Sequence, residues 1–185
     1  MQRIPISDRD RIESALEEGK STDVCDLWVT GTSTELRRKL VTTSGLQSTI
    51  LIQPSAPCES DQLSDFSLDV IADTIKQRHV QCVIVCYQPG DGIQSPPIEP
   101  CSPHEDTNRY RYLLKRICAR VERQRQAQDL IRNHMNQIRR DARIAPALTA
   151  RKISLHGLFY IPESDSFLVY DEATDRFVPI TEARL

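Results

Sequence analysis

The chain has 185 residues, and its 24 Lys and Arg against 26 Asp and Glu give a formal net charge of −2 at pH 7. No apolar run approaches the roughly 18 residues that a membrane helix requires, and residues 1–10 show no secretory signal. Six cysteines without a paired spacing favour a reducing compartment over a disulfide framework. We therefore expect a single domain over residues 1–185, in the cytoplasm or in another intracellular compartment or microcompartment, without membrane association.

The first quarter of the chain alternates amphipathic segments with short apolar runs. Apolar residues at helical spacing predict a helix over 7–19, within an N-terminal helical arm over 1–23. The apolar runs at 27–30 and 49–52 predict two strands, and residues 35–41 between them predict a helical turn or a short helix.

A second helix and a central strand follow. Residues 66–78 fit a helix that begins after Ser64 or Asp65, either of which is a suitable cap. The continuous apolar run at 80–86 is typical of a parallel strand that is covered on both faces. Residues 89–107 contain five prolines and predict an irregular loop.

The last part of the chain combines a long helical pattern with strands. Residues 108–143 carry apolar side chains at helical spacing, and the polar stretch at 123–126 leaves open one helix or two, with Pro146 ending the region. The runs at 153–161 and 167–170 predict a hairpin, and a further apolar run follows it. This order predicts an α/β fold: a mostly parallel β-sheet, flanked by helices, with an antiparallel C-terminal edge strand.

Charge is distributed unevenly along the chain. Residues 109–152 contain 13 Lys and Arg but only three acids, so the remainder of the chain is acidic. One interpretation is a helix whose cations are solvated or paired with acidic loops, and the other is a surface over 109–143 that binds an acidic partner. The segment carries no known nucleic-acid-binding motif, so binding to nucleic acid is not expected.

Several segments resemble the β-class carbonic anhydrases. The likeness covers residues 24–182 and is most specific at Leu155-His156-Gly157, Tyr160, Tyr170-Asp171 and Phe177-Val178-Pro179. It implies the fold of that family, and it implies a homodimer or a higher homo-oligomer.

Members of that family hold zinc through a Cys after the first strand and a His-x-x-Cys after the third, and an Asp and an Arg follow in the order Cys-x-Asp-x-Arg. The zinc lowers the pKa of a bound water to about 7, and the resulting hydroxide attacks carbon dioxide. In this chain the resemblance places other residue types at these five positions. They are Thr32, Thr34 and Leu36 after the first strand, and Gln88 and Asp91 after the third. Gly31 and Gly92 match the adjoining glycines of the family.

These replacements predict the loss of the metal site. The hydroxyl of Thr32 and the amide of Gln88 are poor zinc ligands, and a lone carboxylate at Asp91 prefers magnesium, calcium or manganese. The resemblance therefore implies a pseudoenzyme without zinc or another cofactor. Its role would be structural, regulatory or in assembly with a protein partner, within inorganic-carbon metabolism. The alternative is a divergent zinc-dependent carbonic anhydrase whose ligands have moved to other positions.

Overall fold

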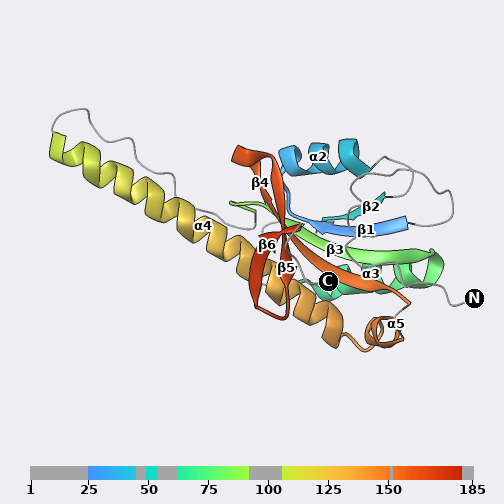
Figure 1. Cartoon of the computed structure of the whole chain (residues 1–185). Coiled ribbons are helices and arrows are strands. Elements are labelled where there is room, and N and C mark those ends of the chain that lie inside the picture. The colour runs from blue at the N-terminus through green and yellow to red at the C-terminus, as the bar shows by residue number, and fades with distance from the viewer. Residues whose placement is uncertain (1–24, 45–48, 54–61, 92–105, 151, 181–185) are drawn as a thin grey trace, which may run out of the picture.

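The computed structural model describes residues 25–44, 49–53, 62–91, 106–150 and 152–180 (Figure 1). They form one six-stranded sheet in the order β2-β1-β3-β4-β5-β6, with helices on both faces. The strands are β1 (Cys25–Thr30), β2 (Thr49–Ile52), β3 (Val80–Tyr87), β4 (Ser154–Ile161), β5 (Ser166–Asp171) and β6 (Arg176–Pro179). The helices are α2 (Thr34–Ser44), α3 (Asp65–Gln77), α4 (Asp106–Arg140), α5 (Ala145–Thr149) and the 3₁₀ turn η1 (Pro162–Ser164).

The pairing of the strands confirms the predicted fold class. Strands β2, β1, β3 and β4 run parallel, whereas β5 and β6 pair antiparallel at the edge. The predicted helix over 7–19 and the whole N-terminal arm over 1–23 lie outside the described residues. No helix of the described ranges is long and apolar enough to cross a membrane.

The two faces of the sheet follow from the two-residue period of its strands. In β1, Leu27 and Val29 join a core with α3 and α4, whereas Trp28 points to the other core, where α2 packs. In the same way β3 sends Val83 and Val85 to the first core and alternate residues to the second. This explains why the segment 80–86 is apolar almost throughout, as a strand covered on both faces requires.

The helix boundaries confirm some predictions and correct others. Ser64 caps α3, because its side chain accepts a hydrogen bond from the backbone N–H of Ser67 at 3.2 Å. The polar stretch at 123–126 does not break α4, which is one helix of 35 residues. Pro146 does not end that helix: α4 stops at Arg140, and Pro146 lies in the first turn of the separate helix α5. Proline is favoured there because its missing N–H is not needed in a first helical turn.

Helix α4 begins at Asp106, so residues 106 and 107 of the predicted proline-rich loop are helical; residues 92–105 of that loop lie outside the described residues. The C-terminal half of α4 packs closely on β4. A Cβ built on Gly157 would fall 2.6 Å from Met135 Sδ and 2.7 Å from Ile131 Cγ2, so only glycine allows this approach. The N-terminal half of α4 extends beyond the sheet (Figure 1).

Ion pairs hold several cations of α4 to acidic residues of the strand connections. Arg132 pairs with Asp175 at 3.1 Å, and Arg120 pairs with Glu163 at 3.1 Å. The interpretation of the basic helix as one whose cations pair with acidic loops is thus confirmed at these positions. The exposed apolar side chains in the N-terminal half of α4 require a separate explanation.

Candidate functional site

The predicted site residues come from two loops at one edge of the sheet. One loop joins β1 to α2, and the other follows β3, the parallel neighbour of β1. The carboxyl ends of neighbouring parallel strands are the usual place for a binding site in an α/β fold.

Asp91 and Gly31 form the central contact of this site. The Asp91 side chain is 3% exposed, and a Cβ built on Gly31 would fall 2.2 Å from its Cγ. Oδ2 of Asp91 accepts a hydrogen bond from the backbone N–H of Gln88 at 2.9 Å, and the backbone N–H of Ser33 donates to the same carboxylate. Asp91 therefore joins the two loops by hydrogen bonds that it accepts from both.

Burial changes the acidity of this carboxylate. It raises the pKa of Asp91 to about 6, although the hydrogen bonds from Gln88 and Ser33 act in the opposite direction. The neighbouring thiol of Cys86 is fully buried, and its burial together with the charge of Asp91 raises its pKa well above the ordinary value. A thiol that keeps its proton is neither a good nucleophile nor a good metal ligand.

The other predicted site residues lie in different environments. Thr32 is exposed, and Thr34 is the exposed first residue of α2. Leu36 is fully buried and packs in the core on the α2 face of the sheet, so it does not line a pocket. Gln88 is partly buried, and its Oε1 has no hydrogen-bond partner among the described residues. Gly92 lies outside the described residues.

The structure also shows two features near this site that sequence patterns did not indicate. The side-chain amide of Gln53, directly after β2, donates to the carbonyl of Gly31 at 3.3 Å. Tyr87 Oη and Nδ1 of His134 share a buried hydrogen bond of 2.8 Å, and burial lowers the pKa of His134 to about 4. In the sequence, the only signal for this pair is the polar residue His134 within the apolar stripe of the predicted helix over 108–143.

The donor set of the site is poor for a metal. Over the ranges that the structure describes, no three His, Cys, Asp or Glu side chains come together in a group that could hold a metal ion. Cys82, on β3, instead donates a hydrogen bond from Sγ to Oδ1 of Asp26 at 3.3 Å. The described part of the two loops thus offers hydroxyl, amide and one carboxylate, which is engaged by backbone N–H groups.

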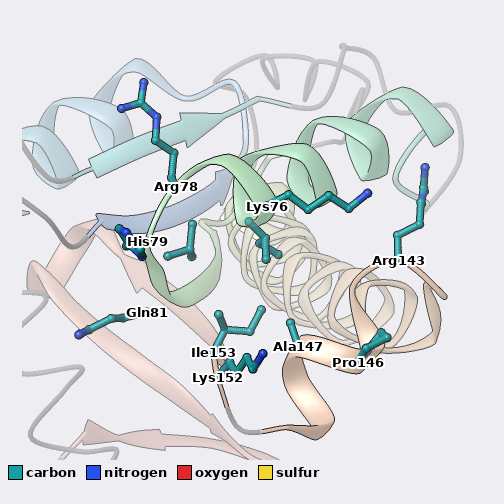
Figure 2. Close-up of a pocket in the computed structure, with 11 residues that line it drawn as sticks. Lys76, Arg78, His79, Gln81, Arg143, Pro146, Ala147, Lys152 and Ile153 are labelled. Atoms are coloured by element: carbon teal, nitrogen blue, oxygen red, sulfur yellow. The ribbon is translucent and has the colours of Figure 1, made fainter.

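A hollow lies at the opposite edge of the sheet, where β3 and β4 begin (Figure 2). Its volume is about 660 Å³, and its lining contains the cations Lys76, Arg78, Arg143 and Lys152 and no carboxylate. Arg143 is held by ion pairs with acidic residues, and the other three cations are exposed at the rim. The hollow is an open, positively charged surface that is separate from the predicted site residues.

Comparisons with known proteins support the fold. No protein-family model matches the sequence, and a search of curated proteins finds none that matches. Among solved structures, the chain is similar to the β-carbonic anhydrase CcaA, with a TM-score of 0.61 and 17% identity over 92% of this chain and 89% of that one. It is also similar to a mutant of the β-carbonic anhydrase CafD of the filamentous fungus Aspergillus fumigatus, with a TM-score of 0.60 and 12% identity over 83% and 92% of the two chains.

A third similar structure is one of two tetrameric β-carbonic anhydrases from Sordaria macrospora. The TM-score is 0.57, and the identity is 12% over 82% of each chain. At identities of 12–17%, these likenesses establish the architecture and leave the chemistry to be argued from the residues of this chain. The chain has a β-carbonic-anhydrase-like fold.

Proposed function

We propose that this chain is a catalytically inactive carbonic-anhydrase-like protein that acts through assembly. The observation that carries the proposal is the contact between Asp91 and Gly31. The resemblance assigns a zinc thiolate to position 91. Here the position holds a buried carboxylate that already accepts two backbone hydrogen bonds.

The same contact supplies a structural reason for the substitution. A zinc ion bound by residues after β1 and after β3 would hold those two loops together. In this chain the Asp91 carboxylate links the same loops through the backbone N–H groups of Ser33 and Gln88. A buried side chain with such partners can link two loops without a metal.

The other positions that the resemblance assigns to the metal site hold neutral residues. Thr32 and Gln88 cannot supply the thiolate and imidazole that bind zinc strongly, and Leu36 is buried where the family places an Arg. Without those groups, the residues at these positions cannot hold a zinc ion that would lower the pKa of a bound water. We therefore infer a structural or regulatory role, with inorganic-carbon metabolism as the setting that the resemblance implies.

The first test is the zinc content of the full chain. The protein is purified without a chelator or a metal-binding tag, and zinc per chain is measured by elemental mass spectrometry beside stopped-flow assays of carbon dioxide hydration. We expect almost no zinc and no hydration above the uncatalysed rate. About one zinc per chain together with hydration would overturn the proposal in favour of a divergent carbonic anhydrase with relocated ligands.

A further inference from the structure

The N-terminal half of α4 carries an exposed apolar stripe. We call residues 110–125 the projecting segment, since this part of the helix extends beyond the sheet (Figure 1). Five large apolar side chains of this segment are between 43% and 68% exposed. They are Tyr110, Leu113, Leu114, Ile117 and Val121. Isolated exposed apolar residues are ordinary, but a continuous stripe of this kind marks an interaction surface.

The spacing of the stripe is that of a helix which packs against a partner. Tyr110, Leu114, Ile117 and Val121 alternate steps of four and three residues, which is the heptad pattern. The next two positions at this spacing hold Gln124 and Gln128, and apolar residues then return at Ile131, Met135 and Ile138, which are at most 1% exposed because the sheet covers them. One stripe is therefore covered by the sheet in its C-terminal half and exposed in its N-terminal half.

Charge restricts what can cover the exposed half. The projecting segment contains six Lys and Arg and one acid, Glu122. Arg111, Arg120 and Arg125 occupy helix positions that flank the stripe. Arg120 already pairs with Glu163 and Arg125 with Glu122 of the same copy, so Arg111 and the nearby Lys115 are the exposed cations that a partner can meet. A surface that offers apolar area together with carboxylates would complement this segment.

The chain itself has such a surface on α3. Asp65, Asp69 and Asp73 recur every four residues, so they lie along the solvent face of the helix, and all three are exposed. Asp69 pairs with Arg143 of the same copy, so Asp65 and Asp73 are the carboxylates that a second copy can meet. Phe66 lies beside them and is 71% exposed. Among the described residues, every large apolar side chain that is strongly exposed belongs either to the projecting segment or to this α3 face.

We infer that the projecting segment of one copy docks on the α3 face of a second copy, where Phe66 meets the apolar stripe and where Asp65 and Asp73 meet Arg111 and Lys115. Each copy carries both surfaces, so the contact can occur twice between the same two copies, related by a two-fold axis, and close a dimer. This inference develops the assembly role proposed above and does not depend on the loss of catalysis.

Two double variants and a control test the contact in the full chain. Leu114→Glu with Ile117→Glu changes the projecting segment, and Phe66→Gln with Asp73→Lys changes the α3 face. All four side chains are exposed, so the fold should persist, which circular dichroism verifies. The control, Asn133→Glu with Asn136→Glu, adds the same two charges at exposed positions of α4 outside the stripe.

Sedimentation velocity then measures the oligomeric state. We expect dimers for the wild type and the control, and at least a tenfold weaker association for each of the other double variants. A mixture of these two variants should form heterodimers, because the intact segment of one meets the intact α3 face of the other. Pairing between two projecting segments would not be restored by mixing.

Other outcomes would overturn the inference. A monomeric wild type would mean that the stripe is covered by residues 1–24 of the same chain or by a different acidic protein. A dimer that persists after substitution of Phe66 and Asp73 would place the interface elsewhere. Zinc content and hydration activity are measured separately, so failure of this inference is distinguishable from failure of the proposed function.

Discussion

The carboxylate of Asp91 lies so close to Gly31 that a Cβ on Gly31 would fall 2.5 Å from each of its oxygens. We expect Gly31→Ala to lower the free energy of unfolding by about 1–3 kcal/mol, because the end of β1 or the turn with Asp91 must move to make room. Urea denaturation monitored by circular dichroism measures this change.

A double-mutant cycle separates this overlap from a general effect of alanine. In an Asp91→Ala background the carboxylate is absent, so Gly31→Ala should cost much less than it does in the wild type. Equal costs in the two backgrounds would show that Asp91 is not the neighbour that excludes a larger residue.

Asp91 also predicts a dependence of stability on pH. Its pKa is raised from an ordinary 3.8 to about 6, so the folded state holds this proton more tightly than the unfolded state. The stability that the protonated group contributes is full below pH 3.8 and is lost as the pH rises through 6. The loss amounts to about 3 kcal/mol.

The Asp91→Asn variant isolates this contribution, because asparagine does not titrate. We expect the variant to gain stability relative to the wild type between about pH 4 and 7, measured by urea denaturation at each pH. Other titrating groups are common to both proteins and cancel in the difference. A difference that stays constant with pH would mean that the Asp91 carboxylate is not desolvated in the folded protein.

Most of the architecture could be predicted from local patterns. The apolar run at 80–86 indicated a doubly covered strand, and Ser64 indicated a helix cap, because both signals depend on neighbouring residues. The break between α4 and α5 was placed wrongly. The predicted helix ran to residue 143, and Pro146 reads equally well as the end of one helix or the first turn of the next.

The candidate site was less accessible to prediction. The resemblance to the β-class carbonic anhydrases placed Asp91 and Gln88 at the site. It could not show that Asp91 contacts Gly31, which lies 60 residues earlier in the chain. It also did not show the buried pair of Tyr87 and His134, which depends on how α4 crosses β3. Such contacts arise from tertiary packing, so no local pattern in the sequence contains them.

His134 predicts a pH dependence of the opposite sign. Burial lowers its pKa from 6.5 to about 4, so the folded state disfavours the protonated ring. The stability associated with neutral His134 is present above pH 6.5 and is lost as the pH falls through 4, by about 3 kcal/mol. His134→Asn, which keeps a polar partner for Tyr87, should therefore lose less stability than the wild type between about pH 7 and 4 in urea denaturation. An unchanged acid response would contradict the burial of this ring.

Restoring the ligand types of the family tests whether the fold still has the geometry of a metal site. The triple variant Thr32→Cys, Gln88→His and Asp91→Cys supplies two thiolates and an imidazole on the two loops that Asp91 now joins. We expect it to retain about one zinc per chain by elemental mass spectrometry. We also expect added zinc to raise its thermal unfolding temperature, because the metal then replaces the hydrogen bonds of Asp91.

The matched control keeps Asp91 and changes only Thr32→Cys and Gln88→His. It should bind zinc at least tenfold more weakly, because a carboxylate that accepts two backbone hydrogen bonds must give them up to become a ligand. Hydration activity should stay absent from the triple variant, since Thr34 and Leu36 still stand where the resemblance places an Asp and an Arg. Failure of the triple variant to bind zinc would mean that the loops after β1 and β3 have moved away from the geometry of a metal site. Zinc binding together with hydration would show that only the ligands had been lost.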